Sequence, residues 1–272
     1  MSSSPGKSTR IGAVSYLNSR PLVQTLQRCF PDADLRLDFP SRLADQLRRE
    51  ELDVALIPSV EYFRTPGYQI VSDACVAARG EVLSVRLFFR KNPSEVRTLA
   101  LDEGSRTSAA LARIILAEHF GVFPQTEPLS LQLGLHHSDA DAVLLIGDRA
   151  MHTPSGQFCR VIDLGQFWYE WTGLPFVFAV WAAREDCATE TLAAGLSQAR
   201  NEGVSLAASI ASEQAPLLGL SEQTAYRYLT HNLHYRLSSA ERSGLRLFYE
   251  LAARHSLVDT HVELRNENLV TA

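Results

Sequence analysis

Four short polar stretches carry the side chains that are best suited to chemistry. They cover residues 15–21, 57–62, 102–108 and 146–150, and each one follows an apolar run and opens a helical pattern. A helix start offers unpaired backbone N–H groups and the positive end of a dipole, which suits a carboxylate or phosphate. Serine, threonine and asparagine side chains add further hydrogen-bonding groups. The four stretches therefore predict a binding site for a small anionic molecule.

A structural explanation exists for each of these side chains. Helix capping is the simpler explanation for any single hydroxyl, and it applies to Ser19, Ser59, Ser105 and Thr107. Asp148 is the lone acid near a strand end, where it could be a cap or an anchor between loops. Three arginines could balance an anion's charge or simply be solvated: Arg20, Arg106 and Arg149. Convergence of four such loops on one cleft favours binding.

Several common sites are not indicated. The GxxxxGK[ST], GxGxxG and GxSxG motifs are absent from the sequence. The histidine pairs His136-His137 and His231/His234 have no cysteine or carboxylate cluster beside them, so no metal site is expected. The four cysteines are far apart, with no CxxC pair, and are expected to be reduced thiols; they are Cys29, Cys75, Cys159 and Cys187.

The composition narrows the class of protein. The chain has 272 residues, of which 46% are hydrophobic, and can bury a large core. A formal charge of −5 gives no sign of the positively charged surface that nucleic-acid binding needs, so nucleic acid is not expected as a partner. No apolar run approaches the roughly 18 residues of a membrane helix. The polar start lacks the apolar segment of a secretion signal, so a cytoplasmic location is expected.

Strand and helix patterns alternate through much of the chain. Strands are expected at 10–14, 35–39, 53–57, 98–101 and 142–146, and helical patterns follow many of them. This alternation predicts an α/β fold with mostly parallel sheets. The last part reads as helical, for example at 190–201, 222–231 and 239–253.

Two longer strand-like segments, 82–90 and 175–183, bracket a middle section with its own strands and helices. If both cross between lobes, the middle section is a second lobe inserted into the first, with a hinge and a cleft. The expected lobes are 9–88 with 180–272, and 89–179. Aromatic residues precede the second crossing, and Trp168 or Trp171 could wall the cleft, although core packing is the simpler explanation.

Six motifs together resemble the chorismate dehydratases of the futalosine route to menaquinone. They are RIGAVSYLNSRPL (10–22), DVALIPSVEY (53–62), SVRLFF (84–89), LDEGSRTSAALARIIL (101–116), LLIGDRA (144–150) and DLGQFWYEWTGLPFVFAVW (163–181). They occur in the expected order; the set is specific, whereas any one motif alone is weak. The helical C-terminal part agrees in character but carries little signature.

The resemblance implies a two-lobed periplasmic-binding-protein-like fold of type 2 and an enzyme without metal or organic cofactor. It implies a carbon–oxygen lyase that converts chorismate to 3-[(1-carboxyvinyl)oxy]benzoate and water. The base would be the enolpyruvyl carboxylate of the substrate itself, held over the ring by the protein.

The site residues follow from the matched motifs. Asn18 and Ser84 occupy the positions tied to catalysis. The substrate-binding candidates are Ser15, Ser59, Thr107, Ser108, Gly147 and Asp148. The resemblance also allows a homodimer, although no motif decides the oligomeric state.

Two alternatives stay open. The sister enzyme 1,4-dihydroxy-6-naphthoate synthase shares the fold, but its pattern places a histidine base where this chain has Ile146-Gly147-Asp148. A non-catalytic cytoplasmic solute-binding protein is also compatible with the fold. Turnover of chorismate, as against binding alone, separates it from an enzyme.

Overall fold

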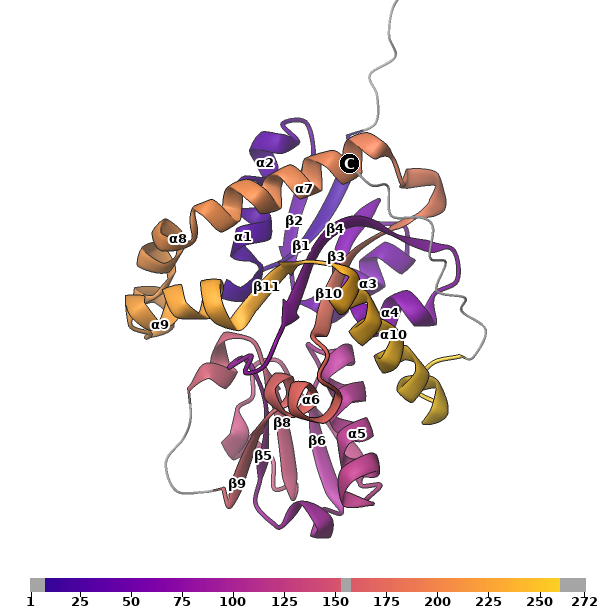
Figure 1. The fold of residues 1–272 in the computed structure, drawn as a ribbon, viewed down its shortest axis with the longest axis vertical. Coiled ribbons are helices and arrows are strands. Elements are labelled where there is room, and N and C mark those ends of the chain that lie inside the picture. Colours follow the sequence, from indigo (N-terminus) through magenta and orange to yellow (C-terminus); the bar gives the residue numbers. More distant parts are fainter. Residues whose placement is uncertain (1–7, 153–157, 260–272) are drawn as a thin grey trace, which may run out of the picture.

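The computed structural model describes residues 8–152 and 158–259, which form two lobes, each built on one β-sheet (Figure 1). The first sheet consists of β1 (Arg10–Val14), β2 (Asp34–Asp38), β3 (Val54–Pro58), β4 (Tyr68–Ala78), β10 (Phe176–Arg184) and β11 (Leu233–Arg236). The second consists of β5 (Val85–Phe89), β6 (Thr98–Asp102), β7 (Gln125–Leu129), β8 (Ala142–Ile146) and β9 (Arg160–Asp163). The chain leaves the first sheet after β4 and returns to it at β10, so the second lobe is inserted into the first.

Both sheets mix parallel and antiparallel pairs. The strand order is β11-β4-β10-β3-β1-β2 in the first sheet and β7-β6-β8-β5-β9 in the second. β1 and β6 pair only in parallel, whereas β10 and β5 are antiparallel to both neighbours. The prediction of mostly parallel sheets is therefore wrong. β5 follows β4 of the other lobe, and β10 follows α6 of the other lobe. Neither strand is joined to a neighbour in its own sheet by a crossover helix, the connection that makes consecutive strands parallel.

The crossings lie in the segments 79–84 and 173–175, as judged from the sheet that each strand joins. The expected boundaries 88/89 and 179/180 fall within β5 and β10, each of which belongs to a single sheet. The residues just before each strand, Val82-Leu83-Ser84 and Leu174-Pro175, are mostly apolar like the strands themselves, so the sequence pattern does not mark the change of sheet. We draw lobe 1 as residues 8–78 and 176–259, and lobe 2 as 85–152 and 158–172.

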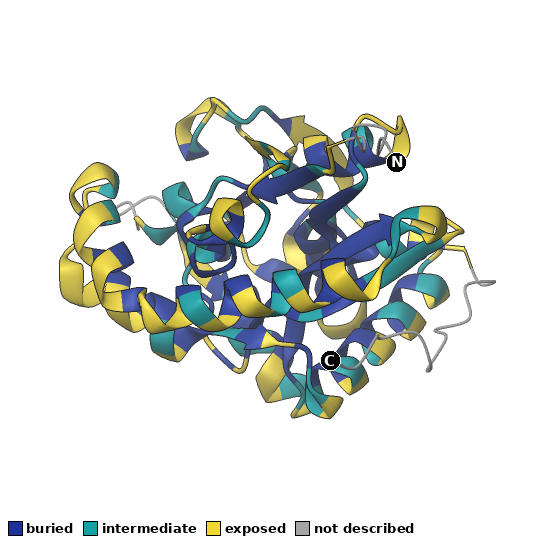
Figure 2. Ribbon diagram, turned by 90° about the horizontal axis from the view of Figure 1, so that it is seen from above, coloured by how far each residue is buried: buried dark blue, intermediate teal, exposed yellow. Residues whose placement is uncertain are grey.

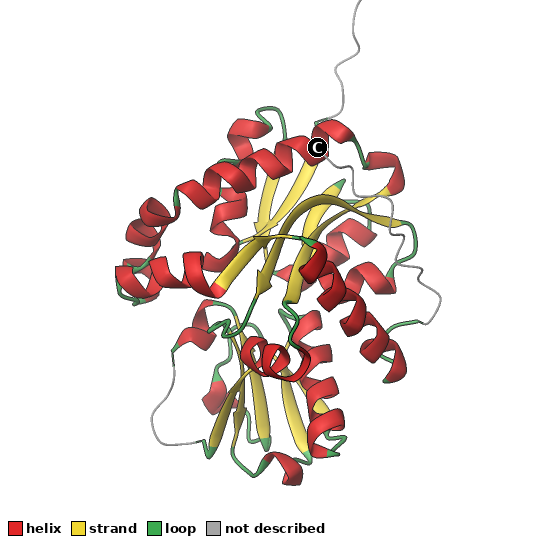
Figure 3. Cartoon of the chain, in the orientation of Figure 1, coloured by secondary structure: helices red, strands yellow, loops and turns green. Residues whose placement is uncertain are grey.

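Helices cover both sheets (Figures 1 and 3). The first lobe contains α1 (Arg20–Val23), α2 (Leu26–Cys29), α3 (Pro40–Arg48), α4 (Ser59–Arg64), α7 (Glu190–Ser205), α8 (Ala207–Gln214), α9 (Glu222–Arg227) and α10 (Ser239–Arg254). The second contains α5 (Arg106–Phe120) and α6 (Leu164–Thr172). Their inward stripes are buried and their outer faces exposed (Figure 2), which is the amphipathic pattern of helices packed on a core.

The C-terminal part is largely helical, as expected. The patterns at 190–201 and 239–253 correspond to α7 and α10, and the pattern at 222–231 corresponds to α9 followed by a π-helical turn, Tyr228–Asn232. Strand β11, which adds to the first sheet by pairing with β4, was not expected from the sequence. Among the described residues, no helix is both long and apolar enough to cross a membrane.

Candidate active site

A cleft between the two lobes collects residues from four chain segments that the sequence singled out. Its empty space is about 480 Å³, a volume that includes space open to solvent. The lining residues are Val14, Tyr16, Asn18, Ser19, Pro40, Pro58, Val76, Val82, Ser84, Val85, Ser105, Ser108, Ile146, Gly147, Phe178 and Ala179. The cleft therefore has apolar walls and a small set of hydroxyl and amide groups.

Four predicted site residues line this cleft, namely Asn18, Ser84, Ser108 and Gly147. The other four lie beside it rather than on its lining; they are Ser15, Ser59, Thr107 and Asp148. The hydrogen-bond partners of these residues indicate which of them can contact a ligand and which hold the loops in place.

The first loop is held from the opposite lobe. It follows β1 and forms a 3-10 turn, Leu17–Ser19, that carries Asn18. The carboxylate of Asp148 accepts from the backbone N–H of Leu17 at 3.1 Å, while Ser19 Oγ donates to Asn18 Oδ1 at 2.8 Å. Burial raises the pKa of Asp148, although the Leu17 N–H and the nearby Arg20 charge oppose the shift. Asp148 thus acts as an anchor between loops. Ser15 makes a further backbone tie, from its N–H to the carbonyl of Asp38.

Ser84 lies at the first crossing and its side chain is fully buried. The preceding residue, Leu83, adopts a left-handed conformation with φ of 61°, which is uncommon for a branched side chain. Asp163 stabilises this bend, because its carboxylate accepts from the N–H groups of Val82 at 3.0 Å and Leu83 at 2.7 Å. The Ser84 carbonyl accepts from Gly147 N–H at 2.9 Å, which joins the crossing to the loop after β8.

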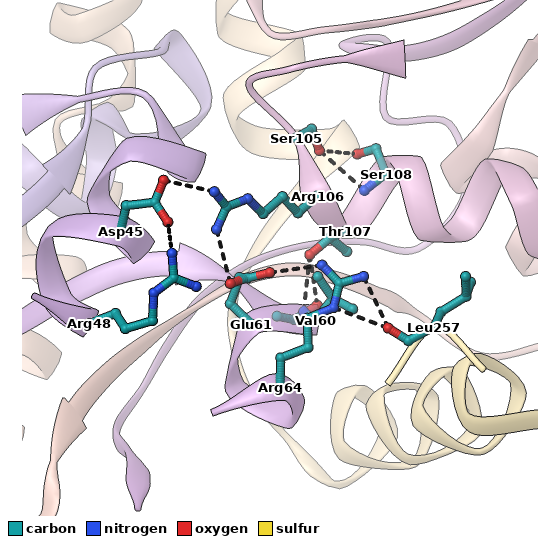
Figure 4. A network of polar contacts seen from close by, with 11 residues as sticks. Asp45, Arg48, Val60, Glu61, Arg64, Ser105, Arg106, Thr107, Ser108 and Leu257 are labelled. Atoms are coloured by element: carbon teal, nitrogen blue, oxygen red, sulfur yellow. Dashed lines mark hydrogen bonds and ion pairs between the residues drawn. The ribbon is translucent and has the colours of Figure 1, made fainter. Parts of the chain in front are cut away.

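The start of α5 forms one wall of the cleft. Ser105 is its N-cap and accepts from the Ser108 N–H at 3.1 Å, and Ser105 Oγ also donates to Ser108 Oγ at 2.7 Å (Figure 4). Because α5 has 15 residues, its N-terminus carries a substantial partial positive charge. The capping interpretation of Ser105 is correct, and this capped turn also faces the cleft.

Ser59 and Thr107 connect the two lobes. Thr107 Oγ1, at the start of α5, accepts from the N–H of Val60 at 3.1 Å and lies 3.4 Å from Ser59 Oγ. Ser59 Oγ donates to the carbonyl of Val177 at 2.7 Å. Both side chains are almost fully buried, so their hydroxyls serve contacts between the lobes.

Two of the three candidate arginines are occupied elsewhere. Arg106 pairs with Asp45 at 2.8 Å and Glu61 at 3.0 Å (Figure 4). Arg149 pairs with Asp102 and donates to the carbonyl of Leu131. No arginine or lysine is among the described residues that line the cleft. An anion bound there would rely on hydroxyl, amide and helix-start donors rather than on a cation.

The aromatic stretch before the second crossing packs in the core. Trp168 is fully buried and its Nε1 donates to the carbonyl of Pro175, while Trp171 packs edge-on against His119. Neither tryptophan lines the cleft; the aromatic wall comes from Tyr16 and Phe178. Phe178 was missed because an apolar strand residue in PFVFAVW carries no sign of which face it occupies.

A further tyrosine was also missed. The hydroxyl of Tyr228, in the π-helical turn, donates to Ser84 Oγ at 2.6 Å. Its segment has no motif, and the contact joins residues that are 144 positions apart. No pattern in the sequence indicates Tyr228. The π-helical turn that carries it, a feature frequent at functional sites, is visible only in the structure. Among the described residues, no group of three potential metal ligands lies together.

The sequence is similar to that of known proteins over most of its length. A family model described as menaquinone biosynthesis matches residues 9–254. The chorismate dehydratase of Thermus thermophilus is 34% identical over 229 residues, covering 78% of this chain and 83% of that protein. The chorismate dehydratase of Campylobacter jejuni is 25% identical over 244 residues, covering 87% and 94% respectively.

Solved structures with the same architecture are more distant in sequence. A protein of Archaeoglobus fulgidus superposes with a TM-score of 0.71 at 17% identity, covering 94% of this chain and all of that one. The periplasmic aliphatic sulphonate binding protein SsuA of Escherichia coli gives 0.62 at 15% identity, covering 96% and 91%. These similarities confirm the predicted periplasmic-binding-protein-like fold.

Proposed function

The chain belongs to the menaquinone biosynthesis family, and we propose that it is a chorismate dehydratase, a hydro-lyase of the futalosine route. The observation that carries the proposal is the meeting of Asn18 and Ser84 in one cleft beside the start of α5. Relatives that match most of the chain carry the same name. We also propose a cytoplasmic location, because all four cysteines are free thiols, the usual state in a reducing compartment.

The reaction needs stabilisation of negative charge more than it needs a strong base. Chorismate loses the hydrogen at its ether-bearing ring carbon, and the neighbouring hydroxyl then leaves to give an aromatic ring. Because that hydrogen is vinylogous to the ring carboxylate, charge moves towards the carboxylate as the proton departs. Preorganised donors around the carboxylate lower the barrier of this step. We assign this task to Ser84, Ser108 and the helix start of α5.

The proton acceptor is assigned to the enolpyruvyl carboxylate of the substrate. The described residues lining the cleft include no histidine, aspartate or glutamate. Apolar walls such as Val76, Val82 and Phe178 would hold the side arm over the ring, where proximity replaces a protein base. The proton taken up by this carboxyl group would then leave with the hydroxyl as water, so the step balances without a co-reactant.

The other candidate residues are assigned different tasks, according to whether they line the cleft or lie behind its lining. Asn18 is assigned to the polar groups of the substrate, including the leaving hydroxyl, and Gly147 to close backbone approach. Four candidates are assigned to holding the cleft in shape from behind its lining: Ser15, Ser59, Thr107 and Asp148. A homodimer stays a prediction from the resemblance, which light scattering of the purified protein would test.

The test is to incubate the purified protein with chorismate and follow products by ultraviolet absorbance and mass. The expected result is enzyme-dependent loss of one water to give 3-[(1-carboxyvinyl)oxy]benzoate. Asn18→Ala and Ser84→Ala should each lower kcat/KM by about 100-fold or more, as removal of an oxyanion donor does. Ser72→Ala is the matched control, since Ser72 is equally buried but bonds within the first lobe. Chorismate that binds and is not turned over would indicate a solute-binding protein instead.

A further inference from the structure

Tyr228 adds a buried hydroxyl next to Ser84. Its side chain is fully buried, and its hydroxyl donates to Ser84 Oγ at 2.6 Å. This contact ties the π-helical turn to the first crossing, where Ser84 lines the cleft together with Asn18.

The direction of this hydrogen bond follows from the number of protons available. A phenol has one proton, and Tyr228 gives it to Ser84 Oγ. With its acceptor role filled by Tyr228, Ser84 Oγ has its own proton for a ligand. Asn18 Oδ1 accepts from Ser19 Oγ at 2.8 Å, so the Asn18 amide offers its Nδ2 protons as donors.

The environment holds Tyr228 in the donor state. Burial raises the pKa of its phenol far above the ordinary value, and the buried carboxylates of Asp148 and Asp163 add to this shift. Interactions with Ser84 and Asn18 lower the pKa but do not cancel this shift. The environment therefore favours the neutral phenol, the form that can donate to Ser84.

The backbone around Tyr228 is also unusual. The residue opens a five-residue π-helical turn between α9 and β11. Such turns are rare and are frequently found at functional sites. Asn232, at the end of the turn, donates from Nδ2 to the carbonyl of Glu81 at 2.8 Å, which ties the turn to the first crossing. The turn is therefore joined to the segment that carries Ser84 at both of its ends.

We propose that Tyr228 is a positioning residue that fixes the orientation of the Ser84 hydroxyl, so that Ser84 presents its proton to the substrate. This inference rests on the proposed function, because it assigns Tyr228 a part in the same reaction. Tyr228 does not line the cleft, so it acts through Ser84, which does. Loss of the Tyr228 hydroxyl should leave Ser84 in place but free to turn its hydroxyl away from the substrate.

The test compares Tyr228→Phe with Tyr235→Phe. Tyr235 is a matched control, because it is also buried and its hydroxyl has no hydrogen-bond partner among the described residues. Tyr228→Phe should lower kcat about tenfold or more and change KM less, while Tyr235→Phe stays within twofold of the wild type. Thermal unfolding of both variants checks that the chain is folded. Equal kcat values for the two variants would overturn the inference.

A double-mutant cycle with Ser84→Ala supplies a readout that a merely structural role would not move. If Tyr228 acts through Ser84, adding Tyr228→Phe to Ser84→Ala should lower kcat by less than threefold further. Losses that simply multiply would contradict the inference. Should Tyr228→Phe fail to fold, Tyr228→Leu, which also lacks the hydroxyl, takes its place in the cycle with Ser84→Ala, and strictly multiplicative losses there would also overturn the inference. Wild-type protein that leaves chorismate unchanged would sink the proposed function itself, a result distinct from all of these.

Discussion

Tyr16 meets the opposite lobe at a point where the chain has no side chain. Gly147 has φ of +70°, and a Cβ built on it would lie only 2.7–3.0 Å from ring atoms of Tyr16. Both residues line the cleft, so the glycine allows the tyrosine ring to form the wall. The requirement at this position is therefore double: a left-handed backbone and space for a neighbouring ring.

Gly147→Ala should displace Tyr16 and reduce activity. We expect a loss of about 1–3 kcal/mol in the free energy of unfolding from the backbone alone, because φ of 70° with ψ of −161° is essentially restricted to glycine, and a fall of about tenfold or more in kcat/KM. Gly121→Ala is a control for a positive φ without crowding, because Gly121 has φ of +64° and nothing lies within 4 Å of the added Cβ. It should lose less stability, since its ψ of 24° places it in the left-handed helical region, and it should keep its activity. The idea fails if both variants lose activity equally.

Asp148 gives a prediction about pH. A carboxyl group whose pKa is higher in the folded than in the unfolded chain holds its proton more tightly when folded. Its contribution to the free energy of unfolding is therefore greatest below the unfolded pKa and is lost as pH rises through the folded pKa. Burial raises the pKa of Asp148 above its ordinary value of 3.8, so this loss falls above that pH.

Asp148→Asn should flatten this part of the stability profile. The amide oxygen can still accept from the Leu17 N–H, so the tie between the lobes is kept while the buried charge is removed. Denaturant unfolding of both proteins from about pH 4 to 8 measures the difference. The free energy of unfolding of the variant, relative to that of the wild type, should increase as pH rises. A relative decrease with rising pH would show that the charge itself stabilises the fold.

Helix α10 packs closely against the second crossing at the position of Gly244. A Cβ on Gly244 would lie 2.0 Å from the carbonyl oxygen of Pro175, a backbone atom that cannot rotate away. Gly244→Ala should therefore cost about 1–3 kcal/mol of unfolding free energy, despite the better helix propensity of alanine. Ser243→Ala, at the exposed neighbouring position of the same helix, should change stability little. Equal midpoints in thermal unfolding would contradict this close packing.

The elements that the sequence predicted well are those with a long or strongly patterned signal. β1 and β8 match their expected ranges, and the capped start of α5 follows from Ser105 and the helical pattern behind it. β11 was missed because Leu-His-Tyr-Arg is short and lies between helical patterns; pairing with β4 decides its conformation. Local sequence does not record a partner so far along the chain.

In the candidate site, too, local motifs were predictable from the sequence, whereas contacts between distant residues were not. Asn18, Ser84, Ser108 and Gly147 were identified by motif, and all four line the cleft. The pattern could not reveal that the hydroxyls of Ser59 and Thr107 face each other across the lobes. Nor could it identify Tyr228, whose part depends on a contact with Ser84.

Across the whole molecule, polar contacts away from the crossings join the lobes. Arg106 of the second lobe bridges Asp45 and Glu61 of the first, and Thr107 bonds the start of α4 beside it (Figure 4). Ser41 N–H also donates to the carbonyl of Gly104. All of these contacts require the lobes to lie close together, as they do here. They therefore stabilise the arrangement in which the two lobes lie close together.

Arg106→Gln should shift the protein towards an open arrangement. It removes both ion pairs across the lobes but leaves Glu61 paired with Arg64 at 2.9 Å, so the first lobe keeps its fold. Arg48→Gln is the matched control, because Arg48 pairs with the same Asp45 but lies on the same helix. We expect Arg106→Gln to have a larger radius of gyration in solution scattering and a kcat/KM lower by about tenfold, which corresponds to roughly 1.4 kcal/mol. The control should resemble the wild type in both measurements. If Arg106→Gln remained as compact and as active as the control, closure would depend on the crossings and the substrate rather than on this bridge.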